Sequence, residues 1–371
     1  MQQQCGSLGN SYILGLDGLR ALSVLAVVAG HAGIPKAPAS LGVTVFFFIS
    51  GFLITGLLLR EAAANHGQFN IKNFYIRRYL RLAPELTLYV AVAVIGSVLI
   101  YGPRRLIDIL GSLFYFMNYV DIFSPSDPPG PFRLGHLWSL SVEEHFYLTW
   151  PLLLSACVGS RQRVISLCAV LILVPIAIRS VALHIGLPIA YLRLASECRI
   201  DSIAFGSLLA AALHYYPSFI RRLTRSGHWT GAVGIILILL FTFGGLINLR
   251  GPAHEILVYT GQGVGITLLF AYLYASNSGG WLLVLLEYSP LRFIGQVSYG
   301  FYLWHFMALY LVAIAFGYAN PQELPITSKF LCAVLGGLLG VMLGWTSLKI
   351  ALRPVRRLRQ RFGAHLLTGR K

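Results

Sequence analysis

Two side chains of the first apolar segment, residues 16–35, have the chemistry to bind an anion and to move a proton. Arg20 lies near the start of the segment and His31 near its end, with almost no polar residue between them. Ionisable groups inside a membrane span cost at least ~2.5–3.5 kcal/mol at its centre, so they indicate function by default. On a helix the two residues are separated by roughly 16 Å and about three turns, which places them on nearly the same face. The alternative is structural, with the arginine reaching the interface and the histidine hydrogen-bonded inside the bundle.

Two adjacent carboxylates lie inside another apolar segment. Glu143 and Glu144 belong to HLWSLSVEEHFYLTWP, residues 136–151, and lie roughly two helical turns into the membrane from the outer side, at a depth similar to that of His31. Adjacent helical residues face about 100° apart, so we expect one of the two to reach His31. A histidine beside a carboxylate is a good general base near neutral pH. Which glutamate pairs with it stays open.

A third motif, FYIRRYLR at 74–81, begins another apolar segment on the opposite side. Arg78 and Arg81 are three residues apart and share a helical face, whereas Arg77 is expected to point elsewhere. Guanidinium groups suit phosphate oxygens, and Arg20 opens onto the same side, so the set predicts a phosphate clamp. The alternative is an anchor of positive charge at the cytoplasmic surface.

Other polar residues lie in or beside apolar segments, and each has a structural interpretation as well. Arg199 and Asp201 form either an external ion pair or a helix cap, and His305 beside Trp304 is equally typical of a hydrogen-bonded structural histidine. The candidates for acceptor binding or structural support are Ser139, Arg199, Asp201, Ser298 and His305.

Composition places the chain in the membrane. Of its 371 residues, 56% are hydrophobic and 11% are charged, whereas a soluble domain has nearer ~25% charged residues. The net charge of +16 fits the excess of Lys and Arg on cytoplasmic loops better than nucleic-acid binding, and no nucleic-acid partner is expected. The five cysteines form no CxxC pair, so we expect neither a disulfide framework nor a metal site.

Ten apolar segments predict an all-α, polytopic integral membrane bundle of about ten helices. The basic loops 61–81, 159–163 and 216–228 and a basic tail at about 353–371 place both termini in the cytoplasm. A crossing of the weaker segment 106–122 would turn the later basic loops outward, so we expect it to be an external, amphipathic segment. The predicted spans lie at 16–35, 41–60, 82–101, 136–158, 163–186, 199–215, 229–249, 255–275, 293–317 and 328–351.

Taken together, the motifs resemble the membrane-bound acyltransferase family 3, whose members O-acylate bacterial surface glycans, lipid-linked sugars and some macrolides. Six stretches occur in the family's order and spacing: LDGLRAL with the later His, GVTVFFFISGFLIT, FYIRRYLRLAP, HLWSLSVEEHFYL, RIDSIAFGSLLA and VSYGFYLWH. The resemblance covers nearly the whole chain and implies a single acyltransferase-3-like transmembrane domain over 1–371. The separate secreted esterase-like domain of some relatives is expected to be absent.

The resemblance also implies residue roles. The family's arginine-X10-histidine motif matches Arg20 and His31, its RXXR motif matches Arg78 and Arg81, and its SxxE-type motif matches the stretch from Ser139 to Glu144. These matches imply His31 as the catalytic base and the three arginines as ligands of an acyl-CoA donor. Three positions depart from the family pattern: Glu85 (often apolar or aromatic), His145 (usually glutamine) and Leu352 (often glutamate).

The expected function is therefore O-acylation in the bacterial cytoplasmic (inner) membrane. Acyl-CoA, by default acetyl-CoA, is the co-substrate with no bound cofactor. The acceptor is the hydroxyl of a glycan, a lipid-linked sugar or a macrolide-type molecule, with polysaccharide O-acetylation favoured. Two alternatives stay open: a proton-coupled transporter, because buried Arg, His and Glu also form proton relays, and a component of an export complex.

Overall fold

Helices joined by short turns make up the described part of the chain. The computed structural model describes residues 15–125, 130–223, 228–244, 251–275, 280–355 and 358, and these residues include no β-strand. Residues 1–14 and most of the basic tail predicted at 353–371 lie outside the described residues. Over the described residues, the all-helical fold class is confirmed.

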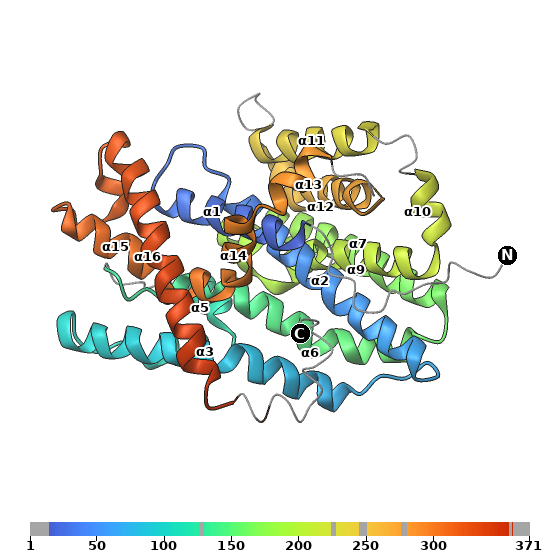
Figure 1. The fold of residues 1–371 in the computed structure, drawn as a ribbon, viewed down its shortest axis with the longest axis horizontal. Coiled ribbons are helices and arrows are strands. Elements are labelled where there is room, and N and C mark those ends of the chain that lie inside the picture. The colour runs from blue at the N-terminus through green and yellow to red at the C-terminus, as the bar shows by residue number, and fades with distance from the viewer. Residues whose placement is uncertain are drawn as a thin grey trace.

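Each of the ten predicted apolar segments contains a helix (Figure 1). In chain order the elements are α1 (Leu16–His31), α2 (Ala39–Ala64), α3 (Ile71–Ile100), α4 (Leu106–Leu113), α5 (Met117–Phe123), η1 (Gly135–Leu137), α6 (Trp138–Cys157), α7 (Arg161–His184), α8 (Ile189–Leu194), α9 (Ser196–Tyr215), α10 (Pro217–Leu223), α11 (His228–Phe243), α12 (Pro252–Ala275), α13 (Trp281–Leu286), α14 (Ser289–Gln296), α15 (Ser298–Ala315), η3 (Pro321–Glu323) and α16 (Ile326–Leu352).

The predicted count of ten spans is not confirmed. Six of the described helices, α2, α3, α7, α12, α15 and α16, are long and apolar enough to cross a membrane. Helices α1 and α11 have 16 residues each, fewer than the ~20 that a span needs. Helices α6 and α9 have 20 residues each but carry charged side chains in their first halves. Segment 106–122 forms the two short helices α4 and α5, with 8 and 7 residues, and neither has the length of a span.

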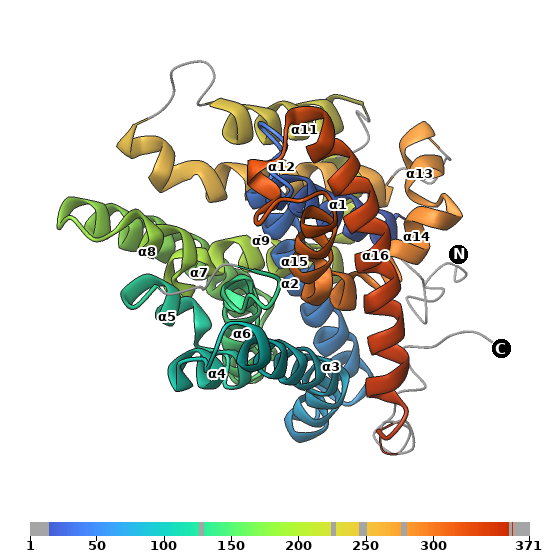
Figure 2. The ribbon, with the colours of Figure 1, turned by 90° about the vertical axis from the view of Figure 1, so that its left-hand side faces the viewer.

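The site is positioned mainly by α1 and α15. Helix α15 packs against α16 and also contacts α1, as Figure 2 shows. Helix α1 packs in turn against α2 and against the short helix α14. Segments from both ends of the chain therefore meet at the centre of the molecule, and chemistry on α1 can be completed by side chains of α15.

Glycines allow α2 and α9 to lie unusually close together. A Cβ atom on Gly206 of α9 would lie 1.9 Å from the carbonyl oxygen of Phe48, and one on Gly51 of α2 would lie 2.0 Å from that of Ile203. Any larger residue would force the two helices apart, since packed interiors have no spare volume. The contact holds α2, which lines the site, against the second half of the bundle.

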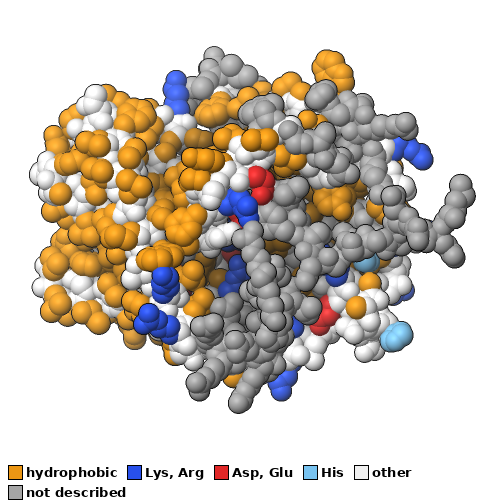
Figure 3. All heavy atoms as spheres, in the orientation of Figure 1, with side chains coloured by type: hydrophobic (Ala, Val, Ile, Leu, Met, Phe, Trp, Pro, Cys, Tyr) orange, Lys and Arg blue, Asp and Glu red, His pale blue; other side chains and the backbone are white. Residues whose placement is uncertain are grey.

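Apolar side chains cover much of the outer surface. Figure 3 shows them over the side formed by α3, α15 and α16. Such an expanse exceeds what a soluble monomer exposes and is typical of a lipid-facing surface. On α16 the exposed large apolar residues are Ile326, Phe330, Leu331, Val334, Leu335, Leu338, Met342, Trp345 and Ile350.

Candidate functional site

Five arginines line one cavity of about 180 Å³. Arg20 comes from α1, Arg60 from the C-terminal part of α2, and Arg77, Arg78 and Arg81 from the N-terminal part of α3. The sequence predicted that Arg20, Arg78 and Arg81 open onto the same side, and the structure brings them to this one cavity. With so many guanidinium groups around it, the cavity is suited to an anion that carries several phosphate oxygens.

The expectation that Arg77 points elsewhere is wrong. Its side chain lines the cavity and forms an ion pair of 3.1 Å with Glu61 of α2. Helix α2 runs past the start of α3 at this point, so positions on more than one face of α3 reach the cavity wall. Arg60 was not singled out from the sequence, although its place at the end of an apolar segment is a detectable signal.

Glu143 lies among these arginines. Its Oε1 accepts a hydrogen bond of 2.9 Å from the Ser50 hydroxyl, and its Oε2 accepts one of 3.4 Å from Tyr147. The guanidinium of Arg78 lies over the Tyr147 ring, 3.9 Å from its centroid. Glu143 and Tyr147 therefore connect α6 to α2 and α3 at the cavity wall, and Glu143 is the one carboxylate among the described lining residues.

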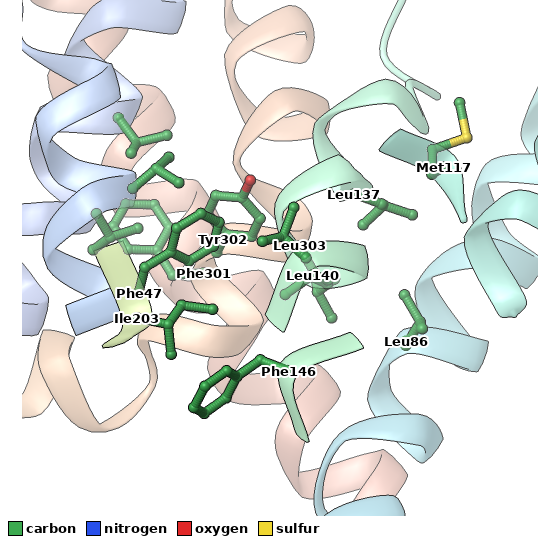
Figure 4. Close-up of a cluster of buried hydrophobic side chains, with 14 of the residues drawn as sticks. Phe47, Leu86, Met117, Leu137, Leu140, Phe146, Ile203, Phe301, Tyr302 and Leu303 are labelled. Atoms are coloured by element: carbon green, nitrogen blue, oxygen red, sulfur yellow. The ribbon is translucent and has the colours of Figure 1, made fainter. Parts of the chain in front are cut away.

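Tyr302 and Ser139 lie at the inner end of the cavity. The Tyr302 hydroxyl donates to the carbonyl of His136 at 2.7 Å, so the Ser139 hydroxyl, also at 2.7 Å, donates to the Tyr302 oxygen. The Tyr302 ring itself packs with buried apolar side chains that include Leu140 and Leu303 (Figure 4). Two hydrogen bonds thus hold the Tyr302 hydroxyl at the cavity wall, and Tyr302 itself was not singled out within the stretch VSYGFYLWH.

His31 lies beyond Tyr302 and does not line the arginine cavity. Its Nδ1 is 2.8 Å from Nε2 of His305, and the two rings are stacked with centroids 5.0 Å apart. The Phe306 ring lies 4.3 Å from the His31 ring. Arg133 lies over the same phenylalanine, with its guanidinium carbon 5.4 Å from the ring centroid. Two residues 274 positions apart in the chain thus form the core of a histidine site.

The expected pairing of His31 with a glutamate of α6 is not found among the described hydrogen bonds. The residue of that motif that reaches the level of His31 is His136 of η1, whose ring lies 5.2 Å from that of His305. Glu143 follows His136 by seven residues, roughly 10 Å further along a helix. The expectation that the two glutamates lie at a depth similar to that of His31 is therefore wrong. His31 is at the end of α1 and lies level with His136, the first residue of the motif.

Glu144 is half-buried, and no hydrogen bond to its carboxylate occurs among the described residues. The Ser298 hydroxyl of α15 accepts a hydrogen bond of 3.2 Å from Nε of Arg20 and lines the cavity. Ser298 and Ser139 therefore belong to the cavity wall, while Glu144 lies next to it on α6.

Arg199 and Asp201 lie in a separate, fully buried network. Asp201 pairs with Arg179 of α7 at 2.8 Å and accepts a hydrogen bond from Thr260 of α12. Arg199 instead stacks on the Tyr259 ring at 3.5 Å. An external ion pair between Arg199 and Asp201 is therefore wrong, because residues two apart on a helix do not face each other. The network joins α7, α9 and α12 and supports the bundle.

No group of three or more His, Cys, Asp or Glu side chains that could hold a metal ion occurs in the part of the chain that the structure describes. The chemistry available at the site is that of imidazole, guanidinium, hydroxyl and carboxylate groups.

Comparison with known proteins identifies the family of the chain. A family model described as an acyltransferase domain matches residues 13–346. The putative peptidoglycan O-acetyltransferase YrhL of Bacillus subtilis (strain 168) is 31% identical over 332 residues, which is 84% of this chain and 50% of the relative. The peptidoglycan O-acetyltransferase OatA of Listeria monocytogenes is 31% identical over 356 residues, which is 87% of this chain and 54% of the relative.

A putative O-acetyltransferase of Staphylococcus aureus (strain COL) is 28% identical over 338 residues, which is 86% of this chain and 54% of that protein. The chain thus spans about half the length of the curated relatives it matches. No solved structure matches it. Because the family model covers nearly the whole chain, the chain belongs to the acyltransferase family.

Proposed function

We propose that this chain is a membrane O-acyltransferase that moves an acyl group, by default acetyl, from acyl-CoA to a hydroxyl group of a glycan or glycosylated acceptor. The observation that carries the proposal is the juxtaposition of an arginine-lined cavity with a histidine pair behind Tyr302. The relatives named peptidoglycan O-acetyltransferases support the acetyl group and the glycan. Peptidoglycan or another surface polysaccharide is the acceptor class that we favour.

The cavity is assigned to the donor. Acyl-CoA carries several phosphate groups on its nucleotide and a thioester at the end of an extended arm. Arg20, Arg78 and Arg81 would bind the phosphates, since planar guanidinium forks match phosphate oxygens. The arm would then extend toward Ser139 and Tyr302 at the inner end. Because acyl-CoA is cytoplasmic, the arginine end of the cavity faces the cytoplasm of the bacterial inner membrane, with both chain termini on that side.

His31 is assigned the role of general base. It accepts the proton of the acceptor hydroxyl, whose oxygen attacks the thioester carbonyl and forms the new C–O bond. The C–S bond then breaks, and the proton held by His31 passes to the departing thiolate, which leaves as the free thiol of CoA. Tyr302 separates the cavity from His31, so its side chain moves aside when the thioester reaches the imidazole.

Thiol release from acetyl-CoA tests this function. The purified protein in detergent is incubated with acetyl-CoA, with and without a surface-glycan extract, and free thiol is measured. We expect release that the extract stimulates, that His31→Ala abolishes and that His184→Ala, a change at an exposed histidine ending α7, leaves intact. Equal release by wild type and His31→Ala would overturn the proposal, and so would proton flux in proteoliposomes without any thioester cleavage.

A further inference from the structure

His305 has a hydrogen-bond partner on each ring nitrogen. The residue is fully buried on α15. Its Nδ1 is 2.5 Å from the carbonyl oxygen of Tyr302, one turn earlier in the same helix. Its Nε2 is 2.8 Å from Nδ1 of His31. The two imidazoles and the carbonyl therefore form one continuous chain of hydrogen bonds.

The carbonyl end of this chain sets the direction of every bond in it. A carbonyl oxygen only accepts, so the proton of the first bond lies on Nδ1 of His305. A neutral imidazole has one donor and one acceptor nitrogen, which leaves a lone pair on Nε2 of His305. That lone pair accepts from Nδ1–H of His31. The remaining nitrogen of His31, Nε2, then carries a free lone pair.

The surroundings favour the neutral form of His305. No carboxylate is hydrogen-bonded to either imidazole among the described residues, and a buried cation without an opposite charge is costly. The nearby charged group is Arg133, which lies over Phe306 and carries the same sign as an imidazolium. A doubly protonated His305 would reverse the bond to His31, and among the described residues no carboxylate is bonded to it to balance the added charge.

We infer that His305 is a positioning residue that holds His31 in the tautomer with its proton on Nδ1, so that Nε2 is the atom that takes the acceptor's proton. The inference rests on the proposed function, in which His31 is the base. A second side chain that fixes the tautomer and orientation of a catalytic histidine is a general requirement of such sites. Here a neutral imidazole anchored on a backbone carbonyl fills that role. When Nε2 of His31 is protonated, the bond from its Nδ1 to His305 becomes charge-assisted and strengthens.

Neighbouring rings pack against the stacked pair. Phe306 lies against both imidazoles, with centroids 4.3 Å from that of His31 and 4.6 Å from that of His305. The His136 ring meets His305 edge-on, with centroids 5.2 Å apart and an interplanar angle of 89°. These contacts restrict rotation of the two imidazoles, so the tautomer set by Tyr302 is also held in a fixed orientation.

The test combines nitrogen NMR of histidine-labelled protein with steady-state kinetics on the wild type and the variants His305→Leu and His305→Gln. The His31 resonances are those lost in His31→Ala. We expect them to report a proton on Nδ1 and none on Nε2 in the wild type. Leucine offers no acceptor, so the tautomer with the proton on Nε2 becomes populated. The amide oxygen of glutamine accepts from Nδ1–H and retains the wild-type tautomer.

The kinetic readout separates positioning from folding. We expect His305→Leu to lower kcat by about 10²-fold or more, with the KM for acetyl-CoA within about twofold of the wild-type value. We expect His305→Gln to keep most of the wild-type kcat. His184→Leu is the control. A wild-type His31 protonated on Nε2, or a tautomer unchanged in His305→Leu, would overturn the inference. The NMR needs no turnover, so the two claims can fail separately. A His31 protonated on Nδ1 in a protein that releases no thiol would contradict the proposed function alone. Thiol release by a protein whose His31 is protonated on Nε2 would contradict the inference alone.

Discussion

Nε of Arg20 donates a hydrogen bond of 3.2 Å to the hydroxyl of Ser298, which ties the start of α1 to the start of α15. His31 and His305 tie the same two helices at the other end. The two contacts are eleven residues apart on α1 and seven apart on α15, about 16 Å and about 10 Å along the respective helices, and the long Arg20 side chain bridges part of the difference. The arginine-lined cavity and the histidine pair are therefore linked through the same two helices.

Arg78→Ala is expected to weaken donor binding. Loss of a charge-assisted contact costs ~1.5–3 kcal/mol, so the KM for acetyl-CoA should rise by about tenfold or more while that for the acceptor changes little. Steady-state kinetics with each substrate varied in turn measures the difference. Arg163→Ala, at an exposed arginine of α7, is the matched control. A larger effect on the acceptor would place the donor elsewhere.

Glu143→Gln is expected to leave the pH midpoint of activity unchanged. With His31 as the proposed base, activity is expected to rise with pH as His31 loses its proton, and a bonded carboxylate would favour the protonated imidazole. Removing such a carboxylate would therefore shift the acid limb to lower pH. Glu143 bonds Ser50 instead, so only the plateau rate should fall. A profile of kcat against pH for wild type and variant decides this, and a shifted limb would restore the glutamate–histidine pair.

Gly206→Ala is expected to destabilise the bundle. The added methyl group would lie 1.9 Å from the Phe48 carbonyl oxygen, and overpacking of this kind costs ~1–3 kcal/mol. Thermal unfolding followed by the fraction of monodisperse protein in detergent gives the comparison. Gly159→Ala is the control, because a Cβ there meets nothing within 4 Å. Equal midpoints for the two variants would contradict the close approach of α2 and α9.

Asp201→Asn should lower the stability of the protein more than Glu255→Gln, although each substitution removes the carboxylate of an ion pair with an arginine. Arg179 and Asp201 are fully buried, and breaking such a pair costs ~3–5 kcal/mol because a charge stays unpaired. Arg193 in the other pair is 54% exposed, where a pair is worth ~0–1 kcal/mol. Thermal midpoints of the two variants should differ accordingly, and similar losses would argue against a buried charge network.

Local spacing made part of the site predictable. Arg78 and Arg81 share a helical face, and the excess of basic residues predicted that Arg20 opens on the same side. The Arg179–Asp201 pair was missed, although residue spacing already excluded Arg199 as the partner of Asp201 and an arginine inside an apolar segment was visible at 179. The ten apolar segments all contain helices, but six of the described helices are long and apolar enough to cross a membrane, whereas α1 and α11 are short and α6 and α9 carry charged side chains.

The contacts that could not be predicted are those between distant segments. Nothing in the sequence near His31 indicates His305, because their meeting depends on how α1 crosses α15. The role of Tyr302 also depends on tertiary structure, since its carbonyl bonds His305 within α15 but its hydroxyl bonds Ser139 and the His136 carbonyl on other segments. The η1 turn, which precedes α6, places His136 near His305 and level with His31. Glu143 and Glu144 follow in α6 and lie too far along it for the pairing with His31 that helix geometry alone had suggested.

Tyr302 also bears on how such a protein keeps a cell's ion gradients. A polar cavity that continued past it to the partly exposed His31 would be a wet path through the bilayer, open to protons and small ions. The phenol ring of Tyr302 lines the cavity and contacts the His305 ring, and its hydroxyl is held by Ser139 and the His136 carbonyl. We therefore expect a smaller residue at this position to raise the proton permeability of the membrane that holds the protein, in addition to any effect on acyl transfer.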